Sequence, residues 1–188
     1  MSFRFSKAQN LRHFTLMNNS PQIRLYNDSG KRLYVNTDES QLYFDAVKEF
    51  HSHDRMSLAM LYWTGCRLSE PLRITTEHID LSEKCVIINT LKQRRSDIFR
   101  KVPTLESYLN VLNLIYNLQS QQKNQSNKLF WNFSRRTAHR YLTDAMSKAK
   151  ITGLQSSAKG LCHGFAVHCV LNGIPLQSIQ KWIGHASM

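Results

Sequence analysis

The sequence contains no long hydrophobic run and comparatively few acidic residues. Its 188 residues include 13 Asp and Glu against 25 Lys and Arg, so the formal net charge is +12 at pH 7. The longest apolar stretches, 58–63 and 166–171, are far shorter than the roughly 20 residues of a membrane-spanning helix. The opening MSFRFSKAQN also lacks the apolar segment of a signal peptide. We therefore expect no membrane partner, and the excess of positive charge favours nucleic acid.

Glycine, proline and paired cysteines are also scarce. The 7 Gly and 4 Pro exclude collagen-like and low-complexity chains. The four cysteines, at positions 66, 85, 162 and 169, form no CxxC pair, which predicts reduced thiols and a cytoplasmic location. A hydrophobic fraction of 41% and an aromatic fraction of 10% exclude a disordered basic tail. The length fits one folded domain with a proper core.

The chain divides into a basic N-terminal arm, 1–36, and a globular domain, 37–188. The arm carries six Lys and Arg against one acid, and its turn signals predict a short hairpin over 23–34. In the domain, helical periodicity and turn residues predict helices over 38–50, 54–64, 104–115, 134–150, 159–172 and 175–183. Apolar runs predict a β-hairpin of strands 85–88 and 98–102, and 119–128 is predicted to be a polar loop. The fold class is mainly α with a small antiparallel β-sheet (α+β).

Four motifs occur in order along the domain. Thr64-Gly65-Cys66-Arg67-Leu68-Ser69-Glu70 follows an apolar helix, and Lys92 lies in the predicted hairpin. The segment 159–166 reads KGLCHGFA, and 182–185 reads WIGH. Over 38–188 the chain resembles the catalytic domain of the tyrosine recombinase (phage integrase) family, which has TGxRxSE, a hairpin lysine, an HxxR helix and an LGH turn.

The resemblance implies that a DNA strand is cleaved and rejoined through a 3′-phosphotyrosyl bond, without a metal or any other cofactor. Arg67 matches the first phosphate-binding arginine, a planar guanidinium suited to phosphate. Lys92 matches the general acid that protonates the departing 5′ oxygen. Lys159 stands at the histidine position of HxxR, and His185 matches the late histidine that binds the phosphate. Glu70, one turn after Arg67, is well placed to orient its guanidinium.

Two departures put cleavage in doubt. The second arginine of the family is Cys162 here, and a thiol cannot fork onto phosphate. In the family the nucleophilic tyrosine lies about nine residues beyond the late histidine, whereas the last tyrosine of this sequence is Tyr141. We therefore expect a domain truncated at its C-terminus and impaired in cleavage. The alternative is a catalytically inactive DNA-binding remnant or regulator of a recombinase.

Double-stranded DNA is the expected partner. Five further residues are expected to contact it: Arg94, Arg95, Arg100, Lys101 and His163. The competing interpretation of the hairpin cations is an ordinary solvated hairpin. Family members assemble as tetramers on paired sites, so the resemblance implies a homo-oligomer on DNA.

Two other interpretations are weaker. Cys162, His163, His168 and Cys169 could suggest zinc, but at 100° per residue the two histidines diverge to opposite flanks of the predicted helix, so no metal site is expected. A helical scaffold that binds protein would make the order of the motifs accidental.

Overall fold

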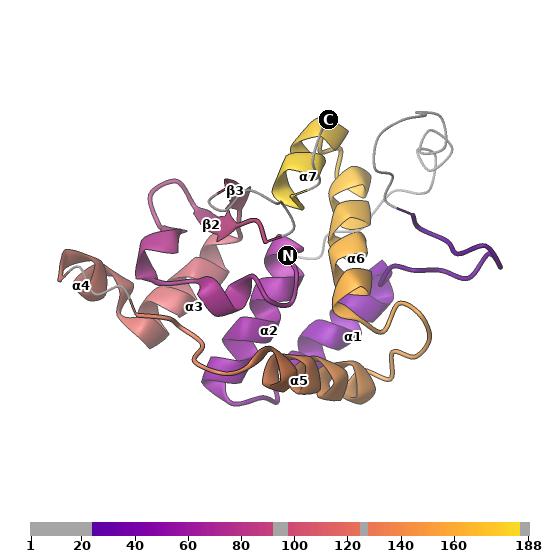
Figure 1. Cartoon of the computed structure of the whole chain (residues 1–188), viewed down its shortest axis with the longest axis horizontal. Coiled ribbons are helices and arrows are strands. Elements are labelled where there is room, and N and C mark those ends of the chain that lie inside the picture. Colours follow the sequence, from indigo (N-terminus) through magenta and orange to yellow (C-terminus); the bar gives the residue numbers. More distant parts are fainter. Residues whose placement is uncertain (1–23, 92–97, 125–127, 185–188) are drawn as a thin grey trace.

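The computed structural model describes residues 24–91, 98–124 and 128–184, and most of them lie in helices (Figure 1). The helices are α1 (Thr37–Val47), α2 (Ser52–Thr64), α3 (Glu106–Tyr116), α4 (Leu118–Lys123), α5 (Arg135–Lys148), α6 (Ala158–Leu171) and α7 (Leu176–Trp182), with short 3-10 turns at Pro71–Arg73 and Thr76–His78. The six predicted helices are confirmed within a few residues. Within these described ranges, no helix has the length and apolar character needed to cross a membrane.

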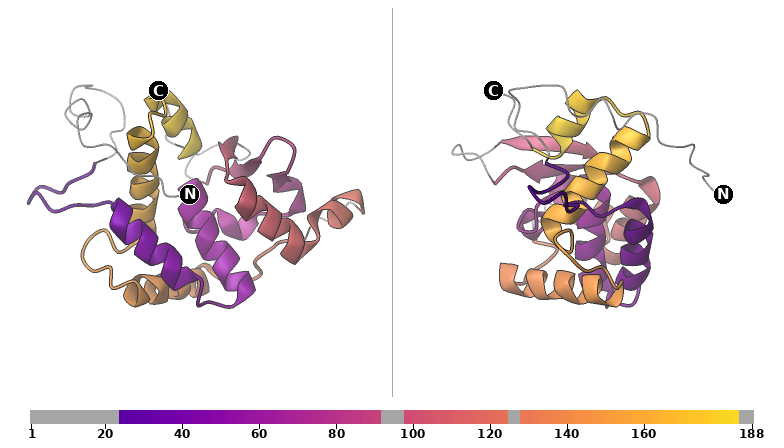
Figure 2. Two further views of the ribbon diagram at one scale, coloured as in Figure 1. Left: turned by 180° about the vertical axis from the view of Figure 1, so that it is seen from behind. Right: turned by 90° about the vertical axis from the view of Figure 1, so that its right-hand side faces the viewer.

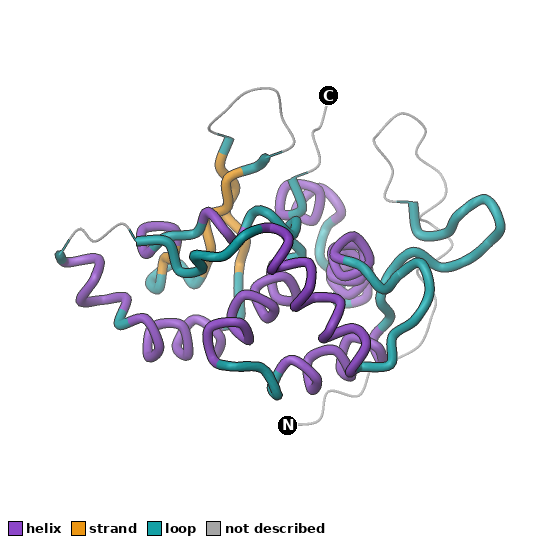
Figure 3. Tube along the Cα trace, turned by 60° about the horizontal axis from the view of Figure 1, so that its bottom comes forward, coloured by secondary structure: helices purple, strands orange, loops and turns teal. Residues whose placement is uncertain are grey.

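One small antiparallel sheet accompanies the helices. Its strands are β1 (Ile79–Asp80), β2 (Cys85–Asn89) and β3 (Phe99–Pro103), hydrogen-bonded in the order β1-β2-β3. Val86 pairs with Val102 across β2 and β3, and both side chains are fully buried. Figure 3 shows the three strands together at one edge of the helical body. The predicted class, mainly α with a small antiparallel sheet, is confirmed.

Helix α2 forms the centre of the core. Met56, Leu58, Met60 and Leu61 are all buried, as expected for a helix that is apolar nearly all round. It packs against α1, α5 and α6. In both views of Figure 2, α5 lies at one end of the molecule and α7 at the other. The C-terminal end of α2 lies against α6, where Gly65 closely approaches the Phe165 ring.

The described part of the N-terminal arm folds back on the domain. Tyr26 and Arg32 form a β-bridge, which confirms a hairpin within 24–34. Arg32 forks onto Glu39 of α1 with two contacts of 2.6 Å. The amide of Val35 donates to the Gly160 carbonyl of α6, and the Val35 side chain is buried. Residues 24–36 thus pack as part of the same body as α1 and α6.

Helix α4 differs from the polar loop predicted over 119–128. Leu118 is fully buried and anchors its first turn. The Gln122 side chain donates to the carbonyls of Thr76 (2.8 Å) and Ile79 (2.9 Å). These tertiary contacts stabilise a polar helix that has no apolar periodicity of its own, which is why the sequence pattern missed it.

Candidate active site

Arg67 follows the sharp turn that ends α2. Gly65 caps the helix with φ +58°, and its amide donates to the Leu61 carbonyl. A Cβ added at Gly65 would lie 2.5 Å from the Phe165 ring of α6. The left-handed backbone and this close approach together require glycine. The turn therefore brings Arg67 toward α6, the helix that carries Cys162.

Glu70 holds Arg67 in place. One carboxylate oxygen of Glu70 accepts from the Arg67 backbone amide at 2.7 Å, and the other accepts from Arg67 Nη1 at 3.0 Å. The Glu70 side chain is 0% exposed, whereas that of Arg67 is 28% exposed. The sequence expectation that Glu70 orients this guanidinium agrees with these contacts. Arg67 keeps part of its guanidinium accessible while its partner is completely buried.

A second arginine, Arg100, shares the same carboxylate. Its Nη2 and Nη1 fork onto Glu70 at 2.6 and 3.2 Å, and Nη1 also donates to Thr90 Oγ1 at 2.9 Å. Its Nε donates to the Trp182 carbonyl at 2.7 Å. The Arg100 side chain is only 7% exposed. We refer to Arg67, Glu70 and Arg100 as the Arg–Glu cluster.

Arg100 lies deeper in the protein than a residue expected to contact DNA. Alternate residues of a strand point to opposite faces, so Arg100 and Val102 face inward while Lys101 faces solvent. The Arg100 guanidinium is occupied by acceptors inside the protein. The sequence shows several Lys and Arg residues in the predicted hairpin. Their presence alone does not indicate that Arg100 faces inward while its neighbours face solvent.

The end of α7 lies directly on the Arg–Glu cluster. Arg67 Nη2 donates to the Gly184 carbonyl at 3.2 Å, a contact between residues 117 positions apart. Gly184 has φ +65°, and a Cβ there would lie 3.2 Å from the Cζ and Nη1 atoms of Arg100. Glycine is therefore needed both for the left-handed turn and for the close approach of the Arg100 guanidinium.

Helix α6 places the remaining candidates at different depths. Lys159, in its first turn, is exposed, whereas Cys162 and His163 are 8% and 4% exposed. Burial raises the pKa of the Cys162 thiol to about 11, although the Arg67 guanidinium acts in the opposite direction. Cys162 is therefore a neutral thiol at pH 7, in the electrostatic field of the Arg–Glu cluster.

His163 does not lie on the surface expected of a DNA contact. Residues 160–164 are all buried because α6 packs against α1, α2 and α7. Around residues 160–164, α6 is covered by other helices and has no freely exposed face. The helical phase of the sequence alone could not show which faces are covered. Within the described ranges, no three His, Cys, Asp or Glu residues form a group that could hold a metal ion.

A hollow of about 390 Å³ lies between β3 and α7, beside the Arg–Glu cluster. Its lining includes Lys101, Lys181 and Trp182. Lys101 and Lys181 are exposed, so two cations flank this hollow. Sequence reasoning missed Lys181, because a single lysine on a short helix carries no motif. The remaining predicted site residues, Lys92, Arg94, Arg95 and His185, lie outside the described residues.

The fold is similar to those of solved DNA integrases and recombinases. The solved structure of the XerA recombinase superposes with a TM-score of 0.68 at 24% identity, covering 82% of this chain and 56% of that chain. XerH recombinase bound to its difH substrate gives 0.68 at 16% identity, covering 86% of this chain and 53% of that chain. The lambda integrase catalytic core gives 0.60 at 15% identity, covering 84% and 94%.

The chain belongs to the phage integrase family, which matches residues 24–188. Among curated relatives, tyrosine recombinase XerC of Chlorobaculum parvum is 28% identical over 151 residues, which are 76% of this chain and 45% of that protein. Tyrosine recombinase XerD of Mycobacterium tuberculosis is 31% identical over 143 residues, or 72% of this chain and 45% of that protein. The chain spans about half the length of these relatives.

Proposed function

We propose that this chain supplies the phosphate-binding and proton-donating groups of a site-specific tyrosine recombinase that cleaves and rejoins duplex DNA. The observation that carries the proposal is the contact between Arg67 and the Gly184 carbonyl. It joins the first motif of the sequence to the last one, directly before His185. Motifs far apart in the sequence thus converge on one partly exposed guanidinium, as a phosphate site requires.

The chemistry assigned to each residue follows from the charge that develops in phosphoryl transfer. Negative charge gathers on the non-bridging oxygens of the phosphate, and Arg67 binds them through a guanidinium that Glu70 orients. His185 donates a further hydrogen bond. Lys92 protonates the departing 5′ oxygen, because a lysine carries a proton on a flexible stem. Lys159, exposed at the start of α6, offers a third cation at the phosphate.

Cys162 limits the rate in this proposal. A buried, neutral thiol adds no positive charge where the family places its second arginine. The proposed enzyme therefore cleaves DNA slowly, and the loss of charge stabilisation is the physical reason.

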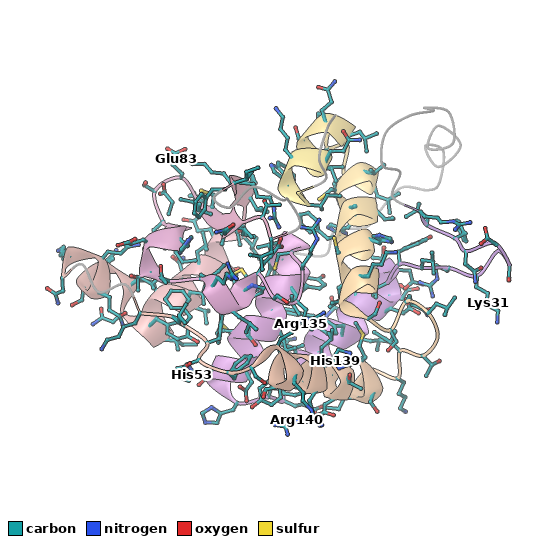
Figure 4. The ribbon with its side chains drawn as sticks, viewed as in Figure 1. Lys31, His53, Glu83, Arg135, His139 and Arg140 are labelled. Atoms are coloured by element: carbon teal, nitrogen blue, oxygen red, sulfur yellow. The ribbon has the colours of Figure 1, made fainter. Side chains whose placement is uncertain are left out.

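The DNA surface is proposed to be formed by exposed cations near the site and along α5. We call them the outer basic surface, with one part near the site and one part along α5 at the opposite end of the molecule from α7: Lys101, Arg135, Arg136, Arg140, Lys159 and Lys181. Figure 4 shows Arg135, His139 and Arg140 along α5. Cations in such an array release counterions from the phosphate backbone, which favours binding to any duplex. Assembly of several copies on DNA and a cytoplasmic location, suited to four free thiols, belong to the same proposal.

A suicide substrate tests the catalytic part. The chain, extended through the tyrosine that the family places after His185, is incubated with a nicked duplex that releases a short 5′-hydroxyl strand on cleavage. We expect a slowly formed covalent protein–DNA complex on a denaturing gel, absent in Arg67→Gln and Lys92→Gln. The matched control Lys123→Gln alters an exposed cation on α4 and keeps the complex. A covalent complex that persists in Arg67→Gln contradicts the proposal.

A further inference from the structure

One guanidinium, that of Arg100, connects three separate elements beside the proposed site. It extends from β3 to Glu70, which follows α2, to Thr90, which follows β2, and to the carbonyl of Trp182, the last residue of α7. The donor–acceptor distances run from 2.6 to 3.2 Å. A planar fork of donors satisfies this set of acceptors, whereas the single ammonium of a lysine cannot.

Stability alone does not explain this arrangement. Glu70 is 0% exposed and Arg100 is 7% exposed, so both charges have lost most of their water. A buried ion pair is often no more stabilising than apolar side chains of similar volume, because desolvation offsets the attraction. What an ion pair adds is fixed geometry, since each hydrogen bond prescribes a distance and a direction.

The geometry that Arg100 fixes includes the two backbone carbonyls at the end of α7. Arg100 holds the Trp182 carbonyl, and Arg67 holds the Gly184 carbonyl. Gly184 packs against the Arg100 guanidinium: a Cβ added at Gly184 would lie 3.2 Å from the Arg100 Cζ and Nη1 atoms. The turn that leads into His185 is therefore held by two arginines that share the carboxylate of Glu70.

Arg100 also changes the charge available at Arg67. In a pair of Arg67 and Glu70 alone, the formal charges cancel. With Arg100 on the same carboxylate, the three side chains carry a formal charge of +1. The 28% exposed Arg67 is the member of the cluster that solvent reaches most, so this surplus is available to an anion there.

We infer that Arg100 is a positioning residue, which sets the orientation of Arg67, the net charge of the Arg–Glu cluster and the position of the turn at Gly184. This inference rests on the proposed function, because it assigns Arg67 and His185 to a phosphate. Arg100 itself is enclosed and does not touch DNA in this scheme. Lysine at this position keeps the charge but loses the fork.

The test uses the whole chain labelled with nitrogen-15 and compares Arg100→Lys with the wild type. The arginine Nε–H signals and the Gly184 amide are followed during titration with inorganic phosphate. We expect the Arg67 and Gly184 signals to shift in Arg100→Lys, and phosphate affinity to fall at least about fivefold, the effect of losing a charge-assisted hydrogen bond. The control Arg73→Lys, exposed and three residues after Glu70, leaves both unchanged.

A milder variant protects the test against misfolding. Thr90→Val removes one acceptor of Arg100 and should shift the same signals in the same direction by a smaller amount.

The inference is overturned if folded Arg100→Lys keeps the wild-type Arg67 signal and phosphate affinity, or if phosphate leaves the wild-type Arg67 signal unmoved. Duplex binding, measured in parallel, separates the two proposals. Wild-type chain that fails to bind DNA contradicts the proposed function, while the signals of Arg67 and Gly184 still test the role of Arg100.

Discussion

Arg100 and Lys101 are neighbours on β3, but Arg100 is buried and Lys101 is exposed to solvent, so their charges interact with different surroundings. Arg100 is the buried arginine of the Arg–Glu cluster, and its Nε, Nη1 and Nη2 each donate to an acceptor inside the protein. Lys101 belongs to the outer basic surface, where the ammonium is hydrated and its interactions depend on salt. In the proposed function, positive charge therefore serves two separate purposes. The cluster fixes geometry, and the outer basic surface attracts DNA.

The largest expected effect comes from adding charge beside the cluster. In the chain extended through the family's tyrosine, Cys162→Arg should raise cleavage of the suicide substrate by about 10³-fold or more, as arginines that stabilise phosphoryl transfer do. The measurement is the rate of covalent complex formation. Leu171→Arg adds the same charge at the exposed C-terminal end of α6. It is the comparison and should give no increase. Rapid cleavage with Cys162 intact contradicts this account.

The second-largest effect is expected from removing the Glu70 carboxylate, which Arg67 and Arg100 share. Glu70→Gln leaves two guanidiniums without a counter-charge, one of them almost fully buried. We expect the free energy of unfolding to fall by about 3–5 kcal/mol, the range found when one partner of a buried pair is removed. Denaturant titration followed by circular dichroism measures it. Asp45→Asn, an exposed carboxylate paired with Lys48, is the control and should remain close to the wild type. Equal stability of the two variants would show that the cluster is not coupled to folding.

Two glycines with the same backbone conformation isolate the contact with Arg100. Gly173 and Gly184 have φ +75° and +65°, but only Gly184 faces neighbouring atoms within 4 Å. Alanine at either site should cost about 1–2 kcal/mol for the left-handed backbone. Gly184→Ala should cost more, because its Cβ meets Arg100 and Thr90. Thermal unfolding of both variants measures the difference, and identical melting temperatures would contradict the proposed packing.

The smallest effects are expected on the outer basic surface. Arg136→Gln should weaken binding to any duplex to a similar degree and reduce the slope of log affinity against log salt by about one phosphate contact. Fluorescence anisotropy at several salt concentrations measures both. The control Lys123→Gln, on α4, should leave the slope unchanged. An equal loss in both variants would mean that net charge alone, and not a defined surface, attracts DNA.

The sequence predicted the parts of the molecule that repeat a local pattern. Helical spacing located α3 and α5, and the motif around Arg67 placed Glu70 one turn away, as the structure has it. It failed where tertiary packing decides. Arg100 and His163 were expected on the surface and are buried, because burial depends on which element covers a face. One local signal did indicate that Arg100 faces inward. In a strand, alternate residues face the same side, and Arg100 alternates with the apolar Val102.

The salt dependence of duplex binding by the wild-type chain is the most direct test of whether its exposed cations bind DNA. We expect binding to duplexes of unrelated sequence at low salt, with log affinity falling linearly with log salt, because exposed cations displace counterions from the phosphates. Absence of binding at low salt, or affinity that does not change with salt, would contradict it.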